Sequence, residues 1–156
     1  MSRSARCLVV LLASLAVMTG VLTGCSSASA ADALQRPAKD VSSAVRAASL
    51  AVDLRMEDST TAAASSTAVD DMLGEVESAT HEVHGVKAPL EDERAVRNDL
   101  LASFSTISRA LLHARDVLGA PATGPGEGQS QLSAVREELR VATGQLDRLM
   151  AKAGIQ

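Results

Sequence analysis

The segment that sets the fold most clearly is LSAVREELRVATGQLDRLMAKA, residues 132–153. Its apolar residues recur at alternating intervals of three and four, which is the spacing of one face of an α-helix and of a heptad seam. With Ser130 as its predicted N-cap, we expect a helix from about residue 130 to the end of this segment. The buried stripe is predicted to be Leu132, Val135, Leu139, Ala142, Leu146, Leu149 and Ala153.

A second helix of the same kind is predicted before it, from Pro89 to about Leu118. Gly85 suits the left-handed position that ends the preceding helix, and Pro89 suits the first helical position, followed by acidic residues at 91–93 that complement the helix dipole. The expected stripe is Val96, Leu100, Phe104, Ile107, Leu111, Ala114 and Leu118.

The first half of the chain predicts two further helices with smaller apolar residues. The first runs from about Asp32, its predicted cap, to Glu57, with Pro37 in about its first turn; its stripe is Leu34, Val41, Val45, Ala48 and Val52. The second runs from about Thr60 to His84, capped by Asp58 or Ser59; its stripe is Val69, Leu73, Val76, Thr80 and Val83, with Met72 beside it. The spacing also continues in register from residue 55 to 66, so a single long helix is the alternative. The Ser and Thr residues there favour a turn.

Together the segments predict an all-α fold, an antiparallel bundle of four helices. The Pro- and Gly-rich segment 119–130 is expected to be a disordered loop between the last two helices. Each buried Leu or Val contributes about 1.5–3 kcal/mol, so most of the stability is expected from the last two helices, or the weaker half packs on a partner.

The N-terminal residues have the order of a secretory signal peptide. Arg3 and Arg6 form a basic segment, residues 7–21 are largely apolar, and small residues follow. The apolar run is shorter than the roughly 20 residues that span a bilayer.

The sequence Leu22-Thr23-Gly24-Cys25 closes this run and resembles the lipobox of bacterial lipoproteins. The resemblance implies that Cys25 receives a diacylglycerol and that residues 1–24 are removed. The predicted organisation is then a signal peptide at 1–24, a flexible tether at 25–31 and a helical domain at 32–156. The alternative is a secreted protein cut near Ala28-Ser29-Ala30, without a lipid.

Composition narrows the function classes. After residue 24, the chain keeps 132 residues and a formal charge of -6, which argues against nucleic acid as a partner. Phe104 is the single aromatic residue, and the mature chain has no thiol beyond Cys25. Twelve Arg against three Lys indicate a GC-rich genome, and the helical make-up resembles that of uncharacterised actinobacterial lipoproteins.

No catalytic motif is found, so we expect a protein that is not an enzyme and carries no cofactor. His81 and His84 are weak metal candidates, because their spacing is one residue too short for the zinc-protease helix. We expect a lipoprotein on the extracytoplasmic face of the membrane that acts through a protein partner or self-association. A small-molecule or metal carrier is the alternative, and it requires a void between the first and third helices.

Overall fold

The computed structural model describes residues 30–120 and 126–155, in which all regular structure is helical. The helices are α2 (Ala30–Met56), α3 (Ala62–Gly85), α4 (Glu91–Gly119) and α5 (Glu127–Lys152). The predicted all-α class with four helices is confirmed. The signal peptide, Cys25 and the rest of residues 1–29 lie outside the described residues.

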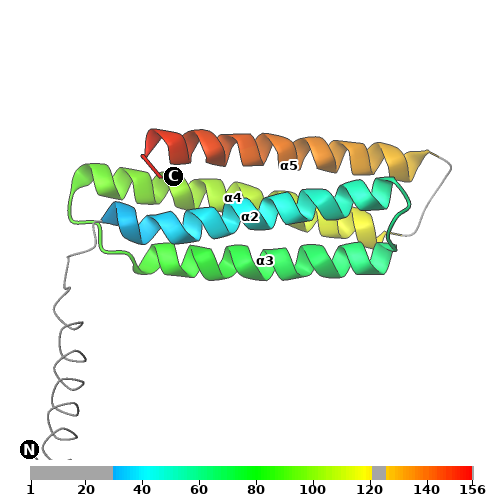
Figure 1. Ribbon diagram of the computed structural model, residues 1–156, viewed down its shortest axis with the longest axis horizontal. Helices are drawn as coiled ribbons and strands as arrows, with labels where there is room; N and C mark the ends of the chain where they lie inside the picture. Colours follow the sequence, from blue (N-terminus) through cyan, green and yellow to red (C-terminus); the bar gives the residue numbers. More distant parts are fainter. Residues whose placement is uncertain (1–29, 121–125, 156) are drawn as a thin grey trace, which may run out of the picture.

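The helices form an up-down-up-down bundle, with α2 between α3 and α5 and in front of α4 (Figure 1). Each helix packs on the next in the chain, α5 returns to α2, and α2 also contacts α4 across one diagonal of the bundle. On the other diagonal, α3 and α5 do not touch. The start of α2, the α3–α4 connection and the C-terminal residues lie at one end of the bundle (Figure 1).

One apolar cluster runs through all four helices and contains nearly all of the predicted stripes. Phe104 is the largest fully buried side chain, and the other large ones with it are Leu34, Leu100, Ile107, Leu111, Leu139 and Leu146. Four predicted stripe residues are only partly buried: Thr80, Val96, Leu149 and Ala153.

The turn between α2 and α3 is confirmed, so the single long helix is wrong. Asp58 takes a left-handed conformation with φ of 55°, and the Ser59 amide donates to the Leu54 carbonyl at 2.9 Å. The cap lies later than predicted: the Thr61 hydroxyl, rather than Asp58 or Ser59, accepts the Ala64 amide at 3.2 Å. The helices end one residue earlier and begin two residues later than the predicted Glu57 and Thr60.

The α3–α4 connection differs from the prediction in both of its marker residues. Gly85 is the last residue of α3, and Val86 follows in an extended conformation, so no left-handed glycine ends this helix. Leu90 is the N-cap of α4, which leaves Pro89 outside the helix instead of at its first position. The Glu93 carboxylate accepts the Leu90 amide at 3.3 Å and so ties the helix start.

The two remaining helix starts were predicted too late. α2 begins at Ala30, so Asp32 lies in its first turn instead of capping it, Pro37 lies inside the helix, and the last two predicted tether residues are helical. α5 begins at Glu127 after Gly126, whose φ of 91° a glycine adopts without steric cost, so Ser130 is not the cap. The predicted loop is therefore shorter than 119–130.

Candidate functional site

An open groove lies between α2 and α5, with a volume of about 790 Å³. One wall belongs to α2 and the other to α5, and the floor is formed by small side chains such as Ser49, Thr143 and Gly144. A Cβ on Gly144 would meet only the guanidinium of Arg148, at 3.6 Å.

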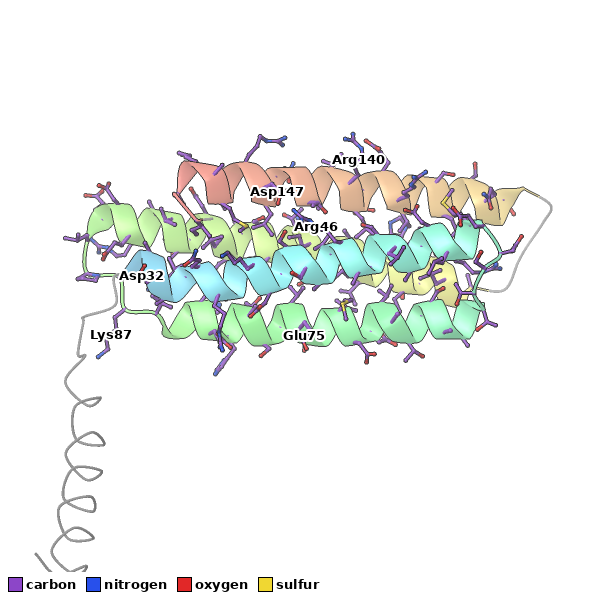
Figure 2. All side chains as sticks on the ribbon, viewed as in Figure 1. Asp32, Arg46, Glu75, Lys87, Arg140 and Asp147 are labelled. Atoms are coloured by element: carbon purple, nitrogen blue, oxygen red, sulfur yellow. The ribbon has the colours of Figure 1, made fainter. Side chains whose placement is uncertain are left out.

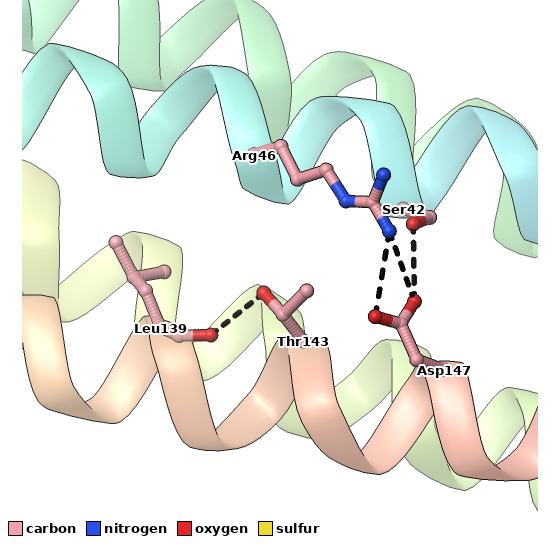
Figure 3. Close-up of polar contacts among 5 residues, drawn as sticks. All are labelled: Ser42, Arg46, Leu139, Thr143 and Asp147. Carbon is pink, nitrogen blue, oxygen red and sulfur yellow. Dashed lines mark hydrogen bonds and ion pairs between the residues drawn. The ribbon is translucent and has the colours of Figure 1, made fainter.

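Ion pairs bridge the two walls (Figure 3). Arg46 of α2 donates to both carboxylate oxygens of Asp147 at 3.3 and 3.4 Å, and the hydroxyl of Ser42 donates to one of them at 3.4 Å. Farther along the groove, Arg136 of α5 pairs with Asp53 of α2 at 2.8 Å. These exposed pairs join α2 to α5 across the groove, and each contributes at most about 1 kcal/mol.

A third pair lies on α5 alone, one turn apart. Arg140 donates to both oxygens of Glu137 at 2.6 and 2.7 Å. The hydrogen bond and the positive charge lower the pKa of Glu137, and the same contact raises the pKa of Arg140. The groove thus carries three guanidinium groups, each with a carboxylate, and it has little net charge.

An apolar row borders the groove on α2. Leu50 is 58% exposed and Leu54 is 37% exposed, and Ala47 is exposed on the same side of the helix. These residues recur at intervals of three and four, so they form a second stripe on the opposite side of α2 from its core stripe. The prediction from sequence missed this row, although its spacing is present in the sequence.

The two histidines share a second groove, between α3 and α4. His81 and His84 are exposed and line a space of about 500 Å³ together with Glu77, Ser105 and Ser108. Among the described residues, no three His, Cys, Asp or Glu side chains come together as a metal site. The third histidine, His113, bridges α4 to α5 through Glu138, with 2.8 Å between the ring nitrogen Nδ1 and the carboxylate.

A small apolar pocket lies at the bundle end where α2 begins. It has a volume of about 150 Å³ and is lined by Leu34, Val96 and Ile155, with Asp92 and Glu93 at its edge. Within residues 30–120 and 126–155, no helix combines the length and hydrophobicity of a membrane-spanning segment.

Comparisons with known proteins identify no relative of this chain. No family model, no curated protein and no solved structure matches this chain.

Proposed function

We propose that the protein is a lipid-anchored lipoprotein on the extracytoplasmic face of a bacterial membrane, and that its bundle acts by binding protein without catalysis. The observation that carries the anchor is the sequence Leu22-Thr23-Gly24-Cys25 behind a basic and apolar leader. The observation that favours protein binding is the exposed apolar row on α2 beside an open groove.

The anchor would fix the orientation of the bundle. Four residues separate Cys25 from Ala30, the first residue of α2, so the five steps from Cα to Cα reach at most about 18 Å in any conformation. The bundle end with the α3–α4 connection and the C-terminal residues then lies nearest the membrane (Figure 1). α2 has 27 residues and is about 40 Å long, so its exposed row and the groove would face sideways, along the membrane surface.

The groove gives no support to a catalytic function. Its arginines are held by carboxylates at 2.6–3.4 Å, and the Thr143 hydroxyl donates to the Leu139 carbonyl of its own helix at 2.8 Å (Figure 3). A paired guanidinium and an occupied hydroxyl stabilise the helix contact and leave no activated nucleophile in this part of the groove.

A carrier function is the weaker alternative. A carrier requires a void between the first and third helices, which are α2 and α4. These two helices pack directly on each other. The side chains of Val41, Val45 and Phe104 on these helices are fully buried. The apolar pocket of about 150 Å³ lies between the first two turns of α2 and of α4, at the end of the bundle, and is no continuous void along these helices.

The anchor is tested by replacing the sulfur that would carry it. Cys25→Ser should move the protein from the membrane fraction to the soluble extracytoplasmic fraction and abolish its labelling by an alkyne-bearing fatty acid. Cys7→Ser is the matched control, because it changes the other cysteine of the chain and should leave both results unchanged. If the Cys25→Ser protein stays on the membrane, or the wild type carries no label, the anchor assignment is wrong.

A further inference from the structure

We propose that the exposed side of α2 is the contact surface for a second copy of this chain, with the two α2 helices parallel. We define this surface, the α2 face, by two rows. One is Ser43, Ala47, Leu50 and Leu54 on α2; the other is Ala64, Ala68, Asp71 and Glu75 on the flank of α3 that adjoins α2. The parallel direction is argued from the match of side chains and, separately, from the proposed anchor; only the second argument rests on the proposed function.

The ion pair between Arg36 and Glu82 shows which side of each helix the two rows lie on. Arg36 of α2 donates to both oxygens of Glu82 on α3 at 2.7 Å, and this contact raises the pKa of Arg36. The α2 row lies 7, 11, 14 and 18 residues after Arg36. The α3 row lies 7, 11, 14 and 18 residues before Glu82. At 3.6 residues per turn, all of these offsets fall within a narrow sector of each helix, so both rows face the same side of the bundle.

The rows also match in height, because α2 and α3 are antiparallel. Ala47 and Asp71 each lie 11 residues, about 16 Å, from the Arg36–Glu82 pair. A second contact confirms this alignment: the Ser65 hydroxyl donates to the Ala51 carbonyl at 3.3 Å. Leu50 and Leu54 therefore lie beside Ala68 and Ala64 and form an apolar half of the face, while Asp71 and Glu75 form an acidic half.

Charge makes the face complementary to a copy of itself. Asp71 and Glu75 form no ion pair with any described residue, whereas the other side of α2 carries Arg46, which is exposed although Asp147 accepts its hydrogen bonds at 3.3 and 3.4 Å (Figure 2). When two copies meet about a two-fold axis along α2, the α3 flank of each one lies against the α5 side of the other. Arg46 is at the height of Asp71, and its guanidinium is 66% exposed beside Asp147, so it can reach the neighbour's carboxylates.

The apolar half fits the same arrangement. Leu50 is 58% exposed and inclined toward the α5 side, where the α3 flank of the second copy would place the small side chains of Ala64 and Ala68. The α2 spacing of 43, 47, 50 and 54 is that of a parallel coiled-coil seam, in which each residue meets its own copy.

An antiparallel pair would place the α3 flank of one copy against the α3 flank of the other and so bring the carboxylates of Asp71 and Glu75 together. The proposed anchors also exclude the antiparallel pair. If both copies are anchored in one membrane, both α2 helices start at the lipid surface and so run in the same direction. The anchored copies share one plane, which raises their effective concentration.

Cysteine crosslinking in the membranes of cells that make the full chain tests the pairing. Ser43 and Leu54 are separated by 11 residues, about 16 Å along α2. A disulfide needs Cα atoms within about 7 Å, so only a parallel pair in register links Ser43→Cys to itself and also Leu54→Cys to itself. Both variants should give a product of twice the mass on mild oxidation. Leu112→Cys, at a position 39% exposed on α4, should give none and is the matched control.

The charges are tested in the Ser43→Cys background. Arg46→Glu should reduce the disulfide yield about fivefold or more, and adding Asp71→Arg to the same chain should restore most of it. A disulfide at neither position, at only one of them, or equally at Leu112→Cys would overturn the parallel pair. Repeating the oxidation with Cys25→Ser separates the two proposals. Whether the protein leaves the membrane fraction tests the anchor, and which cysteine variants form a disulfide tests the α2 face.

Discussion

Phe104 should hold the bundle together more than any other single side chain. It is the only aromatic residue of the chain, and its side chain is fully buried at the centre of α4. Phe104→Ala removes a side chain whose burial contributes about 1.5–3 kcal/mol. A residual cavity of about 80 Å³ adds about 2 kcal/mol, at about 24 cal/mol per Å³. The free energy of unfolding should therefore fall by about 3–5 kcal/mol, a large fraction of the 5–15 kcal/mol of an ordinary domain.

The chain has no Trp and no Tyr, so unfolding is best followed by far-ultraviolet circular dichroism in urea. With a denaturant slope of about 2 kcal/mol per M, the midpoint should fall by about 2 M. Leu112→Ala is the control on the same helix, because Leu112 is 39% exposed and its truncation should cost less than about 1 kcal/mol. A loss below about 1 kcal/mol for Phe104→Ala, or equal losses for the two variants, would contradict this description of the core.

Three further changes follow from local structure. Thr61→Ala removes the side chain that caps α3 and should cost about 0.5–2 kcal/mol in the same urea titration; an unchanged midpoint would show that the hydroxyl contributes nothing. Gly74→Ala should stabilise α3 by about 1 kcal/mol, because a Cβ there meets nothing within 4 Å, and a lower melting temperature would contradict this. Since Arg140 lowers the pKa of Glu137, the pair stabilises the fold above pH 4.5 and this contribution is lost as the pH falls through the lowered pKa. Glu137→Gln should therefore reduce stability slightly at pH 7, and this effect should shrink as the pH falls below 4.5; an effect that does not change with pH would refute the assignment.

The helices and their core stripes could be predicted because the spacing of Leu, Val and Ile is a property of the sequence alone. Helix ends could not, because they depend on local competition. Ser130 is a good cap by composition, yet α5 extends one turn farther, to a glycine that adopts φ of 91°. Gly85 could have ended α3 in a left-handed conformation, but the chain continues extended through Val86 toward Pro89. A proline favours an extended residue before it, and this removes the need for the glycine turn.

The missed part of the candidate site has a different cause. α2 contains two apolar stripes at helical spacing, one through Val41, Val45 and Val52 and one through Leu50 and Leu54. Periodicity identifies both and does not say which is buried. The stripe with more members occupies the core, because α2 must contact α3, α4 and α5 at once and needs a wide apolar sector to do so. The second stripe is left exposed.

The distribution of side-chain size favours different roles for α4 and α2: α4 packs the core, and α2 contacts a second copy. α4 places its large residues inside, from Leu100 through Phe104 to Leu111, whereas α2 fills much of its core with Val and Ala. Two leucines of α2 are instead exposed, Leu50 to 58% and Leu54 to 37%, so they add less to the stability of a single chain than buried leucines do. An exposed pair of leucines lowers solubility unless another surface covers it. The pair lies beside the acidic flank of α3, which would face the exposed Arg46 on the α5 side of a second copy. If α2 serves the contact between copies, then Leu50→Ser should leave the free energy of unfolding unchanged to within about 0.5 kcal/mol while abolishing the disulfide at Ser43→Cys. Loss of stability without loss of pairing would assign Leu50 to the bundle itself.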